Sequence, residues 1–397
     1  MSALGLTGPR LDEWLASHHD ELVAFRRHLH SHPELSGEEH ATTELLAERL
    51  EVAGLPTRVW SSGTGLVCDI GPAPRVALRG DIDALALQDE KAVSYRSQNP
   101  GVAHACGHDV HATVVLGAGL YLARHWPAEV RGLRLIFQPA EERLPGGAVE
   151  VIGDGGLVGV EAIFGVHCDP KLDLGKVGLR AGPITSAADL AVIELLGPGG
   201  HTARPEETVD VVALAALVVT ELPGRVRRRL GSDAPLKIVF GSVHAGDAAN
   251  VIPSRAVLKA SIRTPSVAVW EALPAALDAE LQSLVAGSGA RCSAHYTPGV
   301  PPVTNDARAI EQVRRGVLGV LGEDAITEAT QSWGGDDFAW FTQEVPAAYI
   351  RLGTHDPAAE GPRLDLHAGR FDVDERAIAV GVRVLVAAVE QRLADAS

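Results

Sequence analysis

Four short segments of the chain concentrate the side chains that bind transition metals and transfer protons. They are HACGHDVH at 104–111, FQPAEE at 137–142, FGVHC at 164–168 and LHAGRFD at 366–372. Together they supply a thiol, carboxylates and imidazoles, which form the ligand set of a transition-metal hydrolase. Adjacent glutamates suit this chemistry because one can bind metal while its free neighbour moves protons. We therefore expect an enzyme that cleaves an amide bond with metal-activated water.

The first segment carries the most concentrated candidates. Cys106 and His108 are separated only by Gly107, which lets the loop fold tightly. A lone buried cysteine is usually inert packing, but four polar donors within eight residues favour ligand roles for Cys106 and His108. His104 and His111 suit roles behind the ligands and purely structural roles equally well.

The glutamate pair Glu141 and Glu142 follows the apolar run 133–137. Paired glutamates commonly lie at a solvated strand end, but a preceding run of this kind indicates a buried strand. If one glutamate binds metal, the other can take a proton from water and pass it to the departing nitrogen. His167 and His367 are single histidines, and their local sequence leaves ligand and structural roles open.

Asp81 and Asp83 in GDIDAL follow the short apolar run 76–78. They can cap the following turn. Alternatively, Asp83 can accept the second N–H of a ligand histidine and so fix its tautomer. The pattern by itself favours neither interpretation.

A second group of polar candidates lies further along the chain. The segment GPGGHTAR at 197–204 lacks the Lys-Ser/Thr ending of a phosphate loop, so we interpret it as a flexible loop presenting His201. Asn250 in NVIP and Arg263 at a predicted strand end are candidates for substrate contact. Each of the two could equally be an ordinary surface residue.

The composition of the chain indicates which classes of molecule it can bind. The chain has 397 residues and a net charge of −16, which disfavours a nucleic-acid surface and favours a small-molecule substrate. Its four cysteines show no disulfide-like framework, no export signal is visible, and no apolar run is long enough to cross a bilayer. We expect a cytoplasmic protein in a reducing environment, where a free thiol can bind metal.

The elements that must position these residues alternate between strands and helices. In the first part of the chain we expect strands at 76–78, 133–137 and 162–166, and helices at 113–125 and 147–152, with an earlier helix starting at a Ser36/Glu39 capping box. This alternation predicts an α/β fold with a mixed, mostly parallel sheet. Such sheets carry chemistry at the carboxyl ends of their strands, where the candidate ligands fall.

A different pattern begins near Gly182. Strands and helices are expected in the order β-α-β-β-α-β, at 189–196, 209–222, 236–243, 256–262, 267–284 and 291–296. That order is a ferredoxin-like split βαβ unit. Helix and sheet then resume with segments at 307–321, 347–352 and 374–393. We therefore predict a discontinuous catalytic domain at 1–183 and 300–397, with an inserted domain at 184–299.

The ordered set of motifs, together with LHSHPE at 29–34, resembles the aminoacylase-type dinuclear metallopeptidases. That family includes hippurate hydrolase, bacterial N-acyl-amino-acid amidohydrolases, carboxypeptidase G and plant indole-acetyl-amino-acid hydrolases. The resemblance spans nearly the whole chain. It implies a catalytic domain with an inserted lid or dimerisation domain, a homodimer or higher homo-oligomer formed through that lid, and two divalent ions (Zn, Mn or Co) per subunit.

The resemblance also implies a distribution of the ligands. Cys106 would bridge the two metals, with Glu142 and His367 completing one site. His108 and His167 would complete the other site.

The same resemblance implies roles for the remaining candidates. Glu141 would be the general base. The partner subunit's His201 would stabilise the oxyanion, and Asn250 and Arg263 would lie near the substrate's carboxylate or the scissile group.

We therefore expect an amidohydrolase that cleaves N-acyl amino acids. A dipeptidase or carboxypeptidase would use the same chemistry on small peptides, and a non-catalytic metal-binding protein on the same fold is a remoter alternative. Two positions depart from the family pattern. Ala86 stands where relatives usually have proline, and Asp336 stands where they typically have glutamate.

Overall fold

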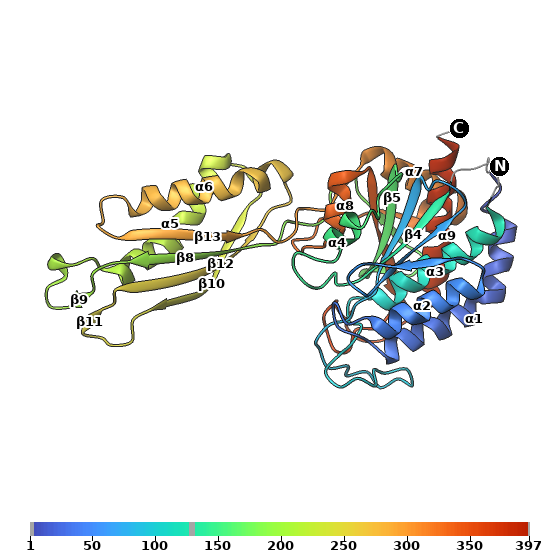
Figure 1. Ribbon diagram of the computed structural model, residues 1–397, viewed down its shortest axis with the longest axis horizontal. Helices are drawn as coiled ribbons and strands as arrows, with labels where there is room; N and C mark the ends of the chain where they lie inside the picture. The colour runs from blue at the N-terminus through green and yellow to red at the C-terminus, as the bar shows by residue number, and fades with distance from the viewer. Residues whose placement is uncertain (1–3, 127–131, 396–397) are drawn as a thin grey trace. The chain divides into compact units, whose positions relative to one another are not determined.

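The computed structural model describes residues 4–126 and 132–395, and within them the chain forms two compact units (Figure 1). The first unit takes Met1–Ile184, Thr304–Thr330 and Asp337–Ser397, and the second takes Thr185–Val303 and Gln331–Asp336. The short segment 331–336 thus packs with the second unit, although the sequence analysis placed it in the discontinuous catalytic part. Among the described residues no helix combines the length and apolarity that crossing a membrane requires.

The first unit is built on an eight-stranded mixed sheet with the order β1-β2-β4-β3-β5-β16-β6-β15. Its strands are β1 (Thr57–Val59), β2 (Leu66–Ile70), β3 (Val76–Asp81), β4 (Leu133–Gln138), β5 (Ala162–Asp173), β6 (Val177–Leu179), β15 (Ile326–Glu328) and β16 (Ala347–His355). The central strands β4, β3, β5 and β16 are mutually parallel. The predicted mixed, mostly parallel sheet is therefore confirmed. Its central parallel strands each begin with an apolar segment, as burial on both faces favours, and carry polar residues toward their carboxyl ends.

Helices cover this sheet (Figure 1). They are α1 (Pro9–Ser31), α2 (His40–Val52), α3 (His108–His125), α4 (Ala148–Gly153), α7 (Ala307–Leu321), α8 (Phe338–Glu344) and α9 (Arg376–Ala394). The helix α3 packs on β3 and α9, and nearly every residue of its first three turns is buried. Gly119 permits this close packing, because a Cβ there would lie 2.3 Å from Leu135 on β4.

The second unit has the predicted β-α-β-β-α-β order. Its elements are β8 (Asp189–Leu196), α5 (Val211–Leu230), β10 (Lys237–Ala245), β12 (Arg255–Arg263), α6 (Val267–Val285) and β13 (Arg291–Thr297). The strands form an antiparallel sheet in the order β10-β12-β8-β13, and α5 and α6 bury their apolar faces with it in a separate core. A short pair, β9 (Gly200–His201) with β11 (Val251–Ile252), forms where the sequence analysis expected only a loop.

The capping box predicted at Ser36 is wrong. The helix α2 begins at His40, and Ser36 donates its hydroxyl to Asp83 Oδ2 at 2.6 Å instead. Glu39 accepts the backbone N–H groups of Gly37 and Ala140, each at 2.8 Å. The side chains of Ser36 and Glu39 thus form hydrogen bonds with residues near the candidate site and do not cap the helix.

Several further boundaries differ from the prediction, and two of them bear on the candidate site. The helix α3 starts at His108, five residues before the expected start, because Gly107 adopts a left-handed conformation (φ 90°) and turns the chain into the helix there. The strand β5 continues to Asp173, so His167 lies within a strand and does not end it.

Replacing Arg26 with methionine should destabilise the first unit strongly. The Arg26 guanidinium is buried on α1 and contacts Asp109 at 2.6 Å, Asp372 at 3.0 Å and Glu375 at 3.2 Å. Its removal would leave the buried Asp109 carboxylate without its cation, which costs ~3–5 kcal/mol. Urea unfolding should show this loss, whereas Arg27→Met, at a half-exposed neighbour, should cost about 1 kcal/mol or less. Equal effects of the two substitutions would contradict the prediction.

Candidate metal centre

Strand order explains why distant residues meet. Asp83 follows β3, Glu142 follows β4 and His167 lies on β5, and these three strands are adjacent and parallel. The carboxyl ends of adjacent parallel strands lie at one edge of the sheet. Cys106 and His108 reach the same place from the start of α3, which packs on β3 and β5.

One cluster contains the thiol and the late histidine. Ligand atoms of Cys106, Glu142 and His367 all lie within 4.8 Å of one another, and His367 Nε2 is 3.3 Å from Glu142 Oε1. The His367 backbone has a left-handed φ of 60°, and its N–H donates to the Ala105 carbonyl at 2.8 Å. Left-handed conformations of this kind concentrate at functional sites, where the surrounding structure holds them.

His167 points its second nitrogen at the same thiol. Its Nδ1 lies 2.7 Å from the Cys168 carbonyl and must donate to it, because a carbonyl oxygen only accepts. The Nε2 lone pair is then an acceptor, and it lies 3.6 Å from Cys106 Sγ, within hydrogen-bond reach of the thiol. Burial, followed by the nearby Arg351 charge, lowers the pKa of His167 well below its usual range. The ring is therefore neutral and has the form that binds metal.

His108 is oriented in the same way by a carboxylate. Its Nδ1 lies 3.1 Å from Asp83 Oδ1, while Nε2 has no hydrogen-bond partner among the described residues. That nitrogen is 3.8 Å from Glu141 Oε2 and 3.9 Å from Glu142 Oε1. Asp83 also accepts the Glu142 N–H at 2.9 Å, so one carboxylate fixes both a histidine ring and the glutamate-bearing backbone.

The spacing of these atoms fits bound cations. Atoms that ligate one tetrahedral ion at 2.0–2.3 Å are ~3.3–3.8 Å apart. The 3.6 Å between Cys106 and His167 and the 3.3 Å between His367 and Glu142 match that spacing. His108 Nε2, buried without a partner in the described structure, is a further atom that a cation would satisfy. The donor set therefore fits bound divalent ions, and Cys106, Glu142 and His367 form one candidate cluster. Among the described residues Cys106, His108 and His167 do not form a second cluster of this kind, so the shared role of Cys106 stays a prediction.

Metal binding should release protons, and affinity should rise with pH. Burial raises the pKa of the Cys106 thiol well above its usual range, so the metal-free thiol is protonated at neutral pH. The pKa of His108 is also well above its usual range, because Asp81 and other neighbours outweigh the opposing effect of burial. Both groups must lose a proton to become ligands. Calorimetric zinc titrations in buffers of different ionisation enthalpy should show proton release, and a pH-independent affinity would contradict it.

His104 and His111, whose roles the sequence left open, differ in their surroundings. His111 accepts the Cys168 N–H at Nε2 (2.8 Å), so Nδ1 carries the proton and donates to Asp81 Oδ1 at 2.7 Å. Both ring nitrogens are thus engaged, and His111 supports the site from behind. His104 is buried, and its nitrogens have no hydrogen-bond partner in the described part of the chain.

The other predicted residues belong to the second unit. His201 lies on β9 and pairs with Val251, and the Thr202 N–H donates to the Asn250 carbonyl, so His201 and Asn250 are neighbours. Arg263 ends β12, with Nε 3.4 Å from Ser261 Oγ. Their contacts with substrate stay predictions.

Sequence reasoning missed two residues that touch the glutamate-bearing loop. Glu39 accepts the Ala140 N–H, and the Asp337 N–H points to Glu141 Oε1 at 3.4 Å. Ala140 has a left-handed φ of 55°, so this loop needs such support. The sequence analysis singled out the neighbouring Asp336, but no local pattern linked Asp337 to Glu141.

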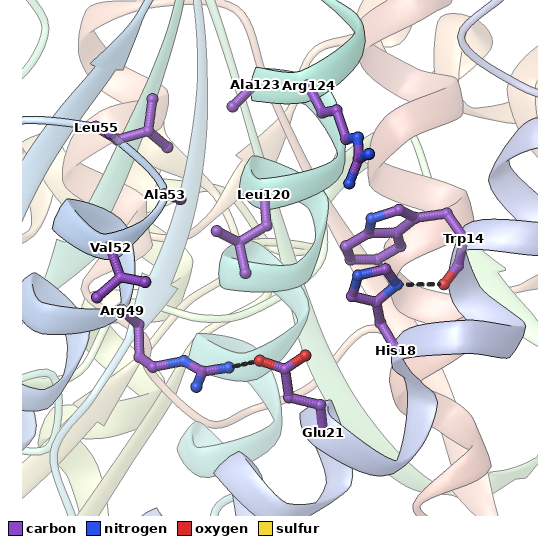
Figure 2. A pocket seen from close by; sticks show the side chains of 11 residues that line it. Trp14, His18, Glu21, Arg49, Val52, Ala53, Leu55, Leu120, Ala123 and Arg124 are labelled. Atoms are coloured by element: carbon purple, nitrogen blue, oxygen red, sulfur yellow. Dashed lines mark hydrogen bonds and ion pairs between the residues drawn. The ribbon is translucent and has the colours of Figure 1, made fainter.

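A surface groove of about 570 Å³ lies elsewhere in the first unit (Figure 2). Trp14 and His18 of α1 form one side, Val52 and Leu55 the other, and Leu120 of α3 lies between them. None of the predicted site residues lines this groove. It is therefore separate from the candidate metal centre.

Comparison with known proteins agrees with this geometry. The profile of Peptidase family M20/M25/M40 matches residues 77–391. A Rhodococcus jostii protein that carries a glutamate–cysteine ligase name is 43% identical over 95% of this chain, which spans only 47% of that protein. The N-acetyl-L-cysteine deacetylase of Bacillus subtilis is 33% identical over 90% of this chain and 85% of its own length. A Bacillus subtilis crystal structure, described as a dinuclear metal-binding peptidase of this family, is 30% identical with a TM-score of 0.82, covering 96% of this chain and 99% of that one.

Fold and side-chain cluster together define a hydrolase that acts on amide bonds. The chain belongs to Peptidase family M20/M25/M40. The resemblance inferred from the motifs is thereby confirmed, and so is the predicted class of enzyme.

Proposed function

We propose that this protein is a metal-dependent amidohydrolase that removes the acyl group from N-acyl amino acids. The convergence of Cys106, Glu142 and His367 within 4.8 Å carries the proposal, because these residues are far apart in the sequence. The deacetylase name of one relative supports an N-acyl amino acid as substrate. A cytoplasmic location and a homodimer are part of the same proposal.

The proposed ligands are Cys106, Glu142 and His367 for one ion and Cys106, His108 and His167 for the other. When bound, two divalent ions (zinc, manganese or cobalt) would supply an activated water and polarise the substrate carbonyl. Asp83 holds the His108 ring so that its Nε2 faces the cluster and can bind metal once it has lost its proton. The Cys168 carbonyl does the same for His167.

Glu141 is the proposed general base. Its Oε2 lies 3.8 Å from His108 Nε2, so the carboxylate borders the ligands, while the Asp337 amide is 3.4 Å from its other oxygen. A carboxylate at this place can take a proton from the attacking water and return it to the leaving nitrogen. The adjacent Glu142 serves as a ligand, so the two glutamates have different roles.

The partner subunit's His201 is the proposed oxyanion donor. We therefore expect His201→Ala to lower kcat by about 10²–10³-fold and to leave the metal content unchanged. His201 is exposed in the second unit, which leaves its ring available. Mixing His201→Ala subunits with subunits disabled at Glu141 should restore activity, since a mixed dimer would contain one complete site. If mixing restored nothing while each variant still exchanged subunits, the shared site would be rejected. Asn250 and Arg263 are proposed to contact the substrate's carboxylate or scissile group.

The function is tested by a substrate screen on enzyme reconstituted with zinc, manganese or cobalt. N-acetyl, N-benzoyl and longer-chain acyl amino acids are compared with dipeptides at equal concentration. We expect the highest kcat/KM with an acyl amino acid. Failure of every acyl amino acid with every metal would contradict the proposal, and failure of the dipeptides as well would favour a non-catalytic metal-binding protein.

A peptidase acting on dipeptides or peptide C-termini is the second candidate. The solved Bacillus subtilis relative is described as a peptidase, and both activities use the same chemistry. A higher kcat/KM with dipeptides in the screen would favour this candidate. Two loop positions bear on substrate choice: Ala86, in place of the usual proline, and Asp336, with a shorter side chain than the usual glutamate.

A further inference from the structure

A buried arginine lies behind the candidate metal centre. Arg79 is on β3, its side chain has no exposed surface, and its guanidinium makes ion pairs with two equally buried carboxylates, Asp81 and Asp337. Its Nε donates to Gln138 Oε1 at 2.8 Å, and its guanidinium carbon lies 5.6 Å from the Phe338 ring centroid. These contacts are all made inside the protein.

One carboxylate links Arg79 to a metal ligand. Asp81 Oδ2 accepts from Arg79, and its other oxygen accepts the His111 Nδ1 proton at 2.7 Å. The opposite His111 nitrogen accepts the Cys168 N–H at 2.8 Å, and Cys168 adjoins the proposed ligand His167. This chain of contacts fixes the backbone of Cys168, the residue whose carbonyl orients the His167 ring. We name it the ligand arm: Arg79, Asp81, His111 and the Cys168 backbone.

The other carboxylate links Arg79 to the general base. Asp337 Oδ1 accepts from Arg79 Nη2 at 2.9 Å, and its Oδ2 accepts the Ala148 N–H at 3.0 Å. Gln138 Nε2 donates to both Asp337 oxygens, at 2.9 and 2.7 Å. These contacts close the loop 139–147, which carries Glu141, and the Asp337 N–H lies 3.4 Å from Glu141 Oε1. We name this the base arm: Arg79, Asp337 and the Glu141 loop.

We propose that Arg79 is a positioning residue that fixes His167 through the ligand arm and Glu141 through the base arm. The inference rests on the proposed function, since it assumes the roles of His167 and Glu141. A guanidinium suits the task because its planar fork can bind two carboxylates and an amide oxygen in fixed directions at once. A lysine keeps the charge but offers a single point donor on a flexible stem, so it cannot hold both carboxylates and Gln138 in place.

The two arms can be separated by substitution. His111→Phe removes both hydrogen bonds of the ligand arm, so zinc affinity of the metal-free protein should fall ~10–100-fold. Asp337→Asn places an amide N–H₂ among groups that all donate hydrogen bonds. We expect kcat to fall about 10-fold or more, while KM and zinc affinity stay within about twofold of the wild-type values. Arg79→Lys should produce both defects together.

The experiment measures three quantities on each variant: zinc affinity and stoichiometry by calorimetry, kcat and KM on the best substrate of the wild-type enzyme, and thermal unfolding. Arg134→Lys is the matched control, because Arg134 is on the neighbouring strand β4 and pairs with Asp69 away from the site. We expect the control to match the wild type in zinc affinity and stoichiometry and in kcat and KM, whatever its unfolding temperature. Gln138→Leu, which removes one neutral donor from Asp337 without a change in charge, should reproduce the kcat defect if Asp337→Asn does not fold.

Some results would overturn the inference while leaving the proposed function intact. If Arg79→Lys lowered only the unfolding temperature, with zinc affinity and kcat unchanged, Arg79 would be structural. If His111→Phe and Asp337→Asn produced identical defects, the two arms would not be separate. Inactivity of the wild-type enzyme on every substrate would instead reject the proposed function, and zinc affinity would still test the ligand arm.

Discussion

Glu141→Gln should retain its metals and lose nearly all turnover. The amide has the size of the carboxylate but cannot accept a proton at neutral pH, so the step assigned to Glu141 fails. We expect kcat to fall by about 10²–10⁴-fold, the contribution typical of a general base. Metal content by elemental analysis should equal that of the wild type, because Glu141 is not one of the proposed ligands.

Two comparisons make this result specific. Glu142→Gln should lose metal affinity together with activity, since Glu142 lies in the cluster with Cys106 and His367. Glu150→Gln, at an exposed position of α4, should behave as the wild type. Normal activity of Glu141→Gln would reject Glu141 as the base, and loss of its metals would mean that Glu141 is itself a ligand.

Cys106→Ser should impair binding at both metal positions. Its thiol lies in the cluster with Glu142 and His367 and also 3.6 Å from His167, so the two proposed sites share it. A serine hydroxyl is a much poorer ligand than a thiolate for zinc-type ions. We expect stoichiometry to fall at both sites and turnover to fall about 10³-fold or more, because the ions lower the pKa of water from 15.7 to about 7.

Cys168→Ser is the matched control for this variant. Cys168 adjoins His167, but its thiol lies 3.8 Å from the Gly107 carbonyl, to which a serine hydroxyl could also donate. It should therefore keep its metals and its activity. If Cys106→Ser bound two ions per chain with normal affinity, Cys106 would not bridge them.

Much of the fold followed from periodicity in the sequence. The helix at Ala307–Leu321 and the β-α-β-β-α-β order of the second unit match the prediction, because their apolar residues recur with the period of the element. The capping box predicted at Ser36 was wrong because the Ser36 hydroxyl donates to Asp83, which is 47 residues away in the sequence. No local sequence pattern contains that contact. The start of α3 was misplaced because the left-handed turn at Gly107 is set by tertiary packing: a Cβ there would lie 2.8 Å from the Cys168 thiol.

The candidate site was predictable only in part. Cys106 and His108 could be identified as candidate ligands because several potential metal-binding side chains occur within the short segment 104–111. His367 had no local signal, and its place beside Cys106 depends on the backbone bond between its N–H and Ala105. The roles of Asp83 and His111 depend on which ring nitrogen faces which acceptor, and that information exists only in three dimensions.

The residence of all five proposed ligands and the proposed base in the first unit has an evolutionary consequence. Selection can vary the surface around Asn250 and Arg263, the proposed substrate contacts, without disturbing the proposed metal ligands or the proposed base, because those two residues belong to the other unit. New specificities can then arise by drift in the inserted segment alone. Descendants of one ancestral gene can therefore differ in the amides they hydrolyse while they inherit the same proposed metal ligands and general base.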